Sequence, residues 1–148
     1  MNLQECFLKI AQIEEEGFLL YKKFSEECSE KLKPVVILIS KEEEEHKKIM
    51  LELSNNEKLK EVQLDKDVEK VFQKQVQYLY NNDKKLNLNS EKEFFIFALQ
   101  LEKNSVEIYT KLLCVFEMDS YGYRSFEELI KQERKHMIFI LNKLYELK

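Results

Sequence analysis

Two glycines and one proline are the only strong helix-breaking residues in this chain of 148 amino acids. Glycine and proline disfavour helix interiors most strongly and supply many turns, so their scarcity favours long helices with few connections. Lysine, glutamate and leucine, which favour helices, are abundant. We therefore expect an all-α protein. Its length is most simply that of one domain, residues 1–148.

Charge and hydropathy argue against several classes of partner. The 24 basic and 28 acidic residues are interspersed, so no basic stripe suits a phosphate backbone and we expect no nucleic-acid partner. The longest aliphatic run, Val35 to Ile39, is too short to cross a bilayer, and no signal-peptide pattern is evident, so we expect no membrane partner. The cysteines contain no C-x-x-C pair and are expected as reduced thiols in a cytoplasmic protein; they are Cys6, Cys28 and Cys114.

Apolar residues recur at helical spacing in four long segments, which form two pairs. The pairs predict one helical hairpin over residues 2–53 and a second over residues 90–148. The stretch 54–89 between them is too long for a tight turn, and it is expected to be a crossover that contains a short helix. Three pairs of residues at helix-capping spacing are Asn2 with Glu5, Ser90 with Glu93 and Ser125 with Glu128.

The apolar residues expected to face inward define one stripe for each segment. They are Phe7, Ile10, Ala11, Phe18 and Tyr21; Leu32, Val36, Ile39, Met50 and Leu53; Phe95, Leu99, Val106, Tyr109, Leu113 and Phe116; and Phe126, Leu129, Ile140 and Leu144. The crossover helix is expected to turn Val68, Val71, Phe72, Val76 and Leu79 inward.

Both histidines of the chain interrupt these stripes together with a glutamate three residues earlier. The two pairs are Glu43 with His46 and Glu133 with His136. Residues three apart share one helix face, so each pair can direct a carboxylate and an imidazole at the same point. Because glutamate is 24 of 148 residues, two such pairs arise by chance about once in forty sequences of this composition.

Two further glutamates, Glu14 and Glu102, also interrupt apolar stripes, and each precedes a tyrosine by seven residues, Tyr21 and Tyr109. Glu102 follows Glu14 by 88 residues, and Glu133 follows Glu43 by 90. The similar offsets indicate that one kind of helical hairpin occurs twice in the chain. Because only Glu14 and Glu43 have matching glutamates in the second half, the repeat distinguishes them from the acidic residues beside them. The others are expected on a solvated face, namely Glu15, Glu16, Glu42, Glu44 and Glu45.

Four inward glutamates without an inward lysine or arginine would be very costly as unneutralised charges. Two divalent cations would balance the four carboxylates while the histidines bind as neutral imidazoles, which predicts a two-metal site. The alternative is a metal-free helical interaction module in which the histidines are ordinary core or surface residues.

At three places the sequence resembles the ferritin-like di-iron carboxylate superfamily, and within it the small rubrerythrin-type proteins. Ile13–Gly17 with Tyr21 looks like the first-helix motif of that family, Leu101–Ser105 with Tyr109 like its third-helix motif, and Glu133–His136 like its fourth-helix ligand motif. The resemblance spans about two-thirds of the chain. It implies a ferritin-like left-handed four-helix bundle, with the long crossover between the second and third helices.

The resemblance also implies a role for each site residue. Glu43 and Glu133 would bridge two iron ions, Glu14 and Glu102 would be terminal ligands, and His46 and His136 would each complete one metal. Tyr21 and Tyr109 would donate hydrogen bonds to ligand carboxylates, or would serve as core aromatics with satisfied hydroxyls.

The implied activity is that of a di-iron oxidoreductase, of peroxidase or ferroxidase type, that reacts with peroxide or dioxygen. Because no C-x-x-C pair could hold a rubredoxin-type iron, an external electron donor is expected. Small bundles of this superfamily often pair, which is compatible with a homodimer. The alternative function is a non-catalytic metal-buffering or sensing bundle, since carboxylate and imidazole ligands also suit manganese and zinc.

Overall fold

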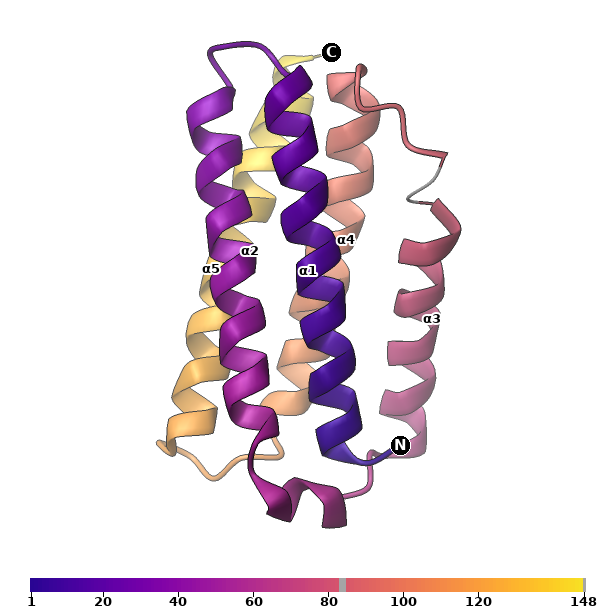
Figure 1. Ribbon diagram of the computed structural model, residues 1–148, viewed down its shortest axis with the longest axis vertical. Coiled ribbons are helices and arrows are strands. Elements are labelled where there is room, and N and C mark those ends of the chain that lie inside the picture. The colour runs from indigo at the N-terminus through magenta and orange to yellow at the C-terminus, as the bar shows by residue number, and fades with distance from the viewer. Residues whose placement is uncertain (83–84, 148) are drawn as a thin grey trace. The chain divides into compact units, whose positions relative to one another are not determined.

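The structure is a computed structural model that describes residues 1–82 and 85–147. Asp83 and Lys84 in the expected crossover, and Lys148 in the expected second hairpin, lie outside the described residues. The described ranges contain five α-helices and no β-strand, which confirms the all-α prediction (Figure 1). In chain order the elements are α1 (Leu3–Glu27), α2 (Lys33–Ser54), the short 3₁₀ helix η1 (Glu57–Glu61), α3 (Lys66–Asn82), α4 (Glu91–Leu113) and α5 (Tyr121–Glu146).

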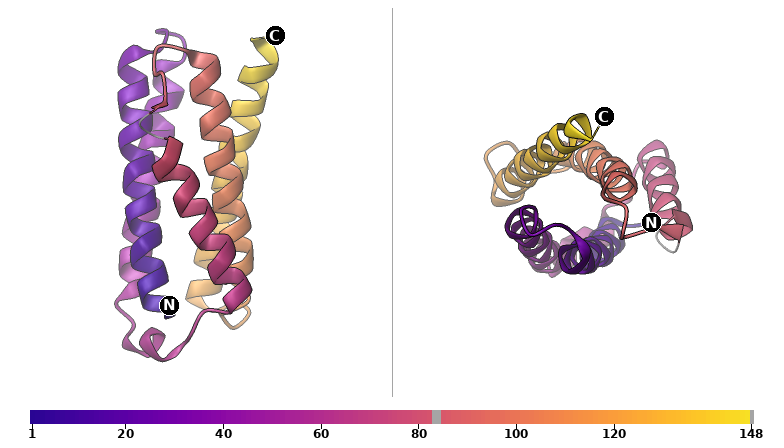
Figure 2. Two further views of the ribbon diagram at one scale, coloured as in Figure 1. Left: turned by 90° about the vertical axis from the view of Figure 1, so that its right-hand side faces the viewer. Right: turned by 90° about the horizontal axis from the view of Figure 1, so that it is seen from above.

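The chain forms two compact units, a first unit of Met1–Glu69 and a second unit that starts at Lys70. In the first unit α1 and α2 form an antiparallel hairpin, and in the second unit α4 and α5 do the same (Figure 1). Each helix pair can be followed end-on in Figure 2. The prediction of a single domain stays a prediction.

The first unit begins with the expected cap. The Asn2 side chain accepts a hydrogen bond from the Glu5 backbone N–H at 2.9 Å, and the Glu5 carboxylate accepts one from the Asn2 N–H at 2.9 Å. Together these bonds form a complete capping box, which satisfies two donors at the helix start. Backbone bonds from Leu3 to Val62 and from Leu64 to Met1 then attach the segment that follows η1 to the N-terminus.

The predicted stripes of the first unit are largely buried. Most of their members are less than a tenth exposed, whereas Phe18 and Leu53 are half-buried. The buried members are Phe7, Ile10, Ala11 and Tyr21 of α1 and Leu32, Val36, Ile39 and Met50 of α2. Pro34 stands in the first turn of α2, where its missing N–H costs nothing.

In the second unit the buried face of α4 is rotated from the predicted one. Phe95, Glu102 and Tyr109 are buried as expected, but Ala98 and Leu112 are buried in place of neighbouring residues. The members of the predicted stripe that are only half-buried are Leu99, Val106, Leu113 and Phe116. Small and large apolar residues alternate closely here, so spacing alone did not identify the innermost positions. The Ser90 hydroxyl caps the helix as predicted, accepting from the Glu93 N–H at 3.2 Å.

The predicted start of the last helix is wrong. Ser120, not Ser125, is the N-cap of α5, and its hydroxyl accepts a hydrogen bond from the Tyr123 N–H at 3.2 Å. Ser125 lies inside the helix and donates to the Tyr121 carbonyl at 2.8 Å. Gly122, expected in a loop, is buried in the first turn beside Phe116, where it leaves room for that ring. The helix thus begins five residues earlier than predicted, and its first turn contains a glycine because the Phe116 ring occupies the space of a side chain.

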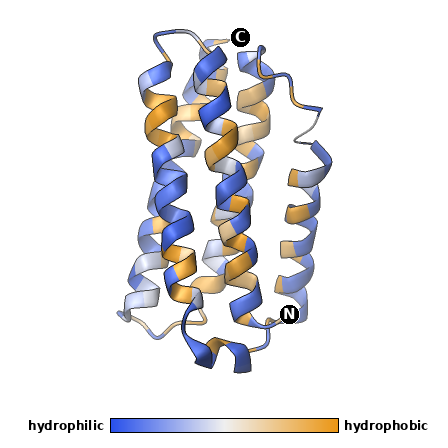
Figure 3. Ribbon diagram, in the orientation of Figure 1, coloured by the Kyte–Doolittle hydropathy of each residue, from blue (hydrophilic) through white to orange (hydrophobic). Residues whose placement is uncertain are grey.

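Helix α3 lies within residues 54–89, where a short helix is predicted. Of its residues expected to face inward, Phe72 and Leu79 are buried, whereas Val68, Val71 and Val76 are half-buried. Hydrophobic positions recur along one side of the helix and polar ones cover the rest (Figure 3). It runs at a slant beside α4 (Figure 2). The rings of Tyr78 on α3 and Phe97 on α4 stack at 5.9 Å between centroids. The 3₁₀ helix η1 was not predicted.

Among the described residues, no helix combines the length and the apolar character that spanning a membrane requires.

Candidate metal sites

The first unit brings together three of the predicted site residues. Glu14 comes from α1, and Glu43 and His46 come from α2. One possible ligand atom from each of them lies within 4.8 Å of the others. The side chains are almost fully enclosed, since Glu14 is 1%, Glu43 5% and His46 0% exposed. We call these three residues the first cluster.

The second unit repeats the arrangement with Glu102 from α4 and with Glu133 and His136 from α5. Here too one possible ligand atom from each residue lies within 4.8 Å of the others. Glu102 is 2%, Glu133 0% and His136 3% exposed. These residues form the second cluster, and each cluster contains two carboxylates and one imidazole.

Local helix geometry explains why the clusters form. The Glu-x-x-His pair in each hairpin lies in an unbroken helix, so its two side chains leave the same face one turn apart. The third residue comes from the buried face of the preceding helix, which packs against that face. Each cluster therefore forms where the apolar stripes of two packed helices meet, because both stripes contain polar residues at the same level along the hairpin.

The separations inside the clusters suit metal ligands. Nδ1 of His46 lies 3.6 Å from Oε2 of Glu14. Nδ1 of His136 lies 3.4 Å from Oε1 of Glu102 and 3.7 Å from Oε1 of Glu133. Ligand atoms that each lie about 2.1 Å from one metal ion are roughly 3.0–4.2 Å apart, so these distances match a shared ion. They are longer than the usual hydrogen bond between nitrogen and oxygen.

The charges also fit a cation in each cluster. Among the described residues the buried carboxylates are those of Glu14, Glu43, Glu102 and Glu133, and no lysine or arginine is buried. Buried ionised carboxylates are very costly unless a partner charge or proton accompanies them. One divalent ion in each cluster balances two carboxylates beside a neutral imidazole. The oxygen and nitrogen donors suit iron, manganese and zinc.

Of the five neighbouring acidic residues predicted on a solvated face, one is exposed and four are half-buried. Glu15 pairs with Lys47 at 2.7 Å, with 37% of the Glu15 side chain exposed. Glu45 is exposed and pairs with Lys48 at 3.1 Å. This hydrogen bond, followed by the charge of Glu45, raises the pKa of Lys48. The remaining three, Glu16, Glu42 and Glu44, are half-buried. None of the five belongs to a cluster.

Tyr21 and Tyr109, the tyrosines expected to donate hydrogen bonds to ligand carboxylates or to serve as core aromatics, are both buried. The Tyr109 ring meets Phe126 edge-on at 5.6 Å between centroids, as a core aromatic does. Their role as hydrogen-bond donors to ligand carboxylates stays a prediction.

Sequence reasoning missed a role for Gly17, which lies one turn after Glu14 on the buried face of α1. A Cβ atom at this position would lie 3.3 Å from Oε2 of Glu43. Gly17 therefore provides the space that the Glu43 carboxylate uses. The available signal was a glycine in the middle of a strongly periodic helix, which usually has a packing or functional reason.

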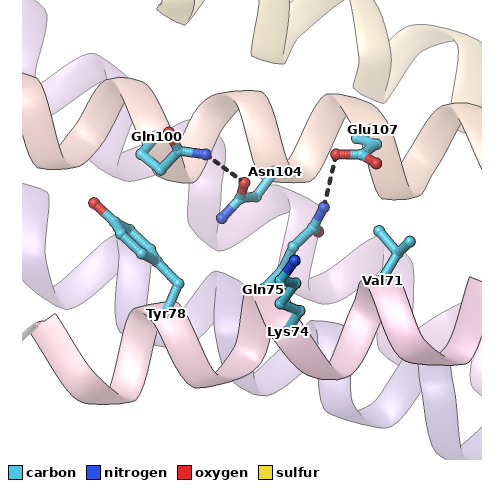
Figure 4. A pocket seen from close by; sticks show the side chains of 7 residues that line it. All are labelled: Val71, Lys74, Gln75, Tyr78, Gln100, Asn104 and Glu107. Atoms are coloured by element: carbon cyan, nitrogen blue, oxygen red, sulfur yellow. Dashed lines mark hydrogen bonds between the residues drawn. The ribbon is translucent and has the colours of Figure 1, made fainter.

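A separate pocket of about 330 Å³ lies between α3 and α4 in the second unit (Figure 4). Gln75 donates to Glu107 across it at 3.1 Å, and Gln100 donates to Asn104 along α4 at 2.8 Å. Burial raises the pKa of Tyr78 at its edge. The Gln75 amide thus contributes to attaching α3 to α4.

The chain matches no protein-family model, no curated protein and no solved structure. The two clusters are therefore the basis for assigning a function.

Proposed function

We propose that the chain is a di-metal carboxylate protein in which each cluster holds one divalent ion, iron in the first instance. The observation that supports this most strongly is the repetition of one buried cluster, two glutamates and a histidine at ligand spacing, in both units. A chance set of buried polar residues would have no reason to recur with the same composition on matched helices.

The proposal includes the fold that the sequence motifs imply, a left-handed ferritin-like four-helix bundle with residues 54–89 as its crossover. In that arrangement Glu43 and Glu133 would bridge the two ions. Its support is the resemblance of the motifs around Glu14, Glu102 and His136 to those of the superfamily, together with the internal repeat. Magnetic coupling between two Fe(III) ions tests the bridge, because isolated ions on separate sites would show none.

The proposed activity is the reduction of peroxide or dioxygen. Iron supplies the two electrons for this chemistry when bound. The carboxylates of the clusters fix the charge and position of the ions, and the neutral imidazoles of His46 and His136 each contribute a nitrogen donor. Burial of all six side chains limits the access of water. Re-reduction then requires an electron donor outside the chain.

The first experiment is metal quantification on protein purified without added metal, followed by loading with Fe(II) under anaerobic conditions. The expected result is about two iron ions per chain, fewer than about 0.2 being incompatible with the proposal. Added peroxide should then oxidise the iron rapidly, and a reductant should restore it over repeated cycles. The Glu133→Gln variant, which lacks one proposed ligand carboxylate, is the control and should lose iron binding.

A non-catalytic metal-buffering or sensing protein is the alternative outcome. The ligand set itself supports it, because two carboxylates and an imidazole do not choose strongly among iron, manganese and zinc. Native occupancy by zinc, or an iron-loaded protein that does not react with peroxide, would favour this function over the oxidoreductase.

A further inference from the structure

Gly17 of α1 lies beside the Glu43 side chain of the first cluster. A Cβ atom there would lie 3.3 Å from Oε2 of Glu43 and 3.9 Å from both Cδ and Cγ of the same side chain. The first distance is shorter than an ordinary van der Waals contact, so any side chain at this position would displace the carboxylate by a few tenths of an ångström. The backbone of Gly17 is helical, and its φ angle is not positive. The glycine is therefore required by space and not by backbone conformation.

Glycine is an unfavourable choice for this position in every other respect. Gly17 lies well inside the 25-residue helix α1, where alanine would favour the helix more. Replacing it with alanine would also reduce the conformational freedom of the unfolded chain. Helix stability alone thus predicts a more stable protein after the substitution, and a loss of metal affinity would then come from the contact with Glu43.

The second cluster differs from the first at the matched position. Glu14 corresponds to Glu102 and Tyr21 to Tyr109, both with an offset of 88 residues, so Gly17 corresponds to Ser105. Ser105 is half-buried on α4. The second unit therefore has a side chain where the first has none, although the two clusters have the same composition.

We propose that Gly17 is a positioning residue that keeps open the space for the Glu43 carboxylate, and that the two metal sites are therefore not equivalent. The inference rests on the proposed function, since it assumes that Glu43 is a metal ligand. Ligand distances in a metal site must be kept within about 0.2 Å, which is comparable to the displacement a methyl group would force. A displacement of this kind weakens binding about tenfold, as loss of a residue that orients a ligand typically does.

The experiment is a Co²⁺ titration followed by visible absorption, because the spectrum of Co²⁺ reports its ligand geometry. Wild type should bind two ions. In Gly17→Ala and Gly17→Ser the ion of the first cluster should bind about tenfold more weakly with an altered spectrum, and the second ion should weaken as well if Glu43 bridges the two. The matched controls Ser105→Ala and Ser105→Gly should retain the affinity of wild type at both sites. Thermal unfolding of the metal-free proteins completes the set, and Gly17→Ala should unfold at the same temperature as wild type or higher.

Each contrary outcome has a separate meaning. A wild-type protein that binds no Co²⁺ would overturn the proposed function, and this inference with it. Two ions bound by Gly17→Ala with unchanged affinities and spectra would overturn the positioning role while the proposed function stands. A metal-free Gly17→Ala protein that unfolds at a lower temperature would assign the glycine to packing, which also overturns the inference.

Discussion

Nδ1 of His136 on α5 lies 3.4 Å from Oε1 of Glu102 on α4. The matched atoms of His46 and Glu14 are 3.6 Å apart between α2 and α1. Each hairpin thus joins a histidine to the glutamate of its neighbouring helix at nearly the same separation. The internal repeat of the sequence is therefore also a repeat of geometry within each unit.

Replacing Glu102 with glutamine is expected to remove the metal of the second cluster. The amide has nearly the shape of the carboxylate but lacks its charge, so the stoichiometry should fall from about two ions per chain to about one. Without metal the variant should be as stable as wild type or more stable, because a buried charge is gone. Metal analysis and thermal unfolding measure the two effects. Glu45→Gln, on an exposed side chain, is the control that should change neither.

Metal ions are expected to stabilise the folded chain by mass action. At a free-metal concentration one hundred times the dissociation constant, each occupied site adds about 2.7 kcal/mol to the free energy of unfolding. Denaturant unfolding with metal and with a chelator measures this difference. The double variant Glu43→Gln with Glu133→Gln should show none. Identical curves for chelated and metal-loaded wild type would contradict both metal sites.

Cys6 is expected to make the protein less stable at alkaline pH. Burial first, and then the negative charge of Glu69, raise the pKa of its thiol from 9.0 to about 12, while the N-terminal amine lowers it. Below pH 9 the thiol is neutral in both states and contributes no pH dependence. Above that pH the unfolded chain loses the proton first, so the free energy of unfolding should fall by about 1.4 kcal/mol per pH unit until pH 12.

Denaturant unfolding from pH 8 to 10.5 in wild type and Cys6→Ala tests the effect of this thiol. The difference between the two curves removes the contributions of the lysines and tyrosines, which both proteins share. Parallel curves would show that the Cys6 thiol is not shielded in the folded chain. Thiol labelling at pH 8 provides a second measurement, since exposed Cys114 should react while Cys6 should not.

Gly122→Ala is expected to destabilise the start of α5. A Cβ atom at Gly122 would overlap the Phe116 ring, with its Cδ1 and Cε1 atoms well inside van der Waals contact. Overpacking of this kind typically costs about 1–3 kcal/mol, which exceeds the gain in helix propensity. The free energy of unfolding measures it. Ser125→Ala, in the same helix, is the matched control and should not destabilise. A more stable Gly122→Ala protein would mean that the ring moves aside freely.

The course of the helices could be predicted because it depends on local properties of the sequence. Period, capping residues and the scarcity of glycine predicted a helical hairpin over residues 2–53 and a helix that begins after Ser90, and the observed helices agree to within a few residues. The predicted start of α5 was wrong, because Ser125 and Glu128 have the spacing of a capping pair although the helix is capped by Ser120. Gly122 packs beside Phe116 in the first turn of the helix, a contact that no local rule contains.

The sequence by itself determined the all-α class and the identities of the six candidate ligands, because helical period and an internal repeat are one-dimensional properties. Only the tertiary structure decided that each set of three lies within ligand distance inside one unit, and that Gly17 provides the space for Glu43. Those relations depend on how far apart two helix axes pack and on which side chains meet between them. Spacing along a single helix does not specify either quantity.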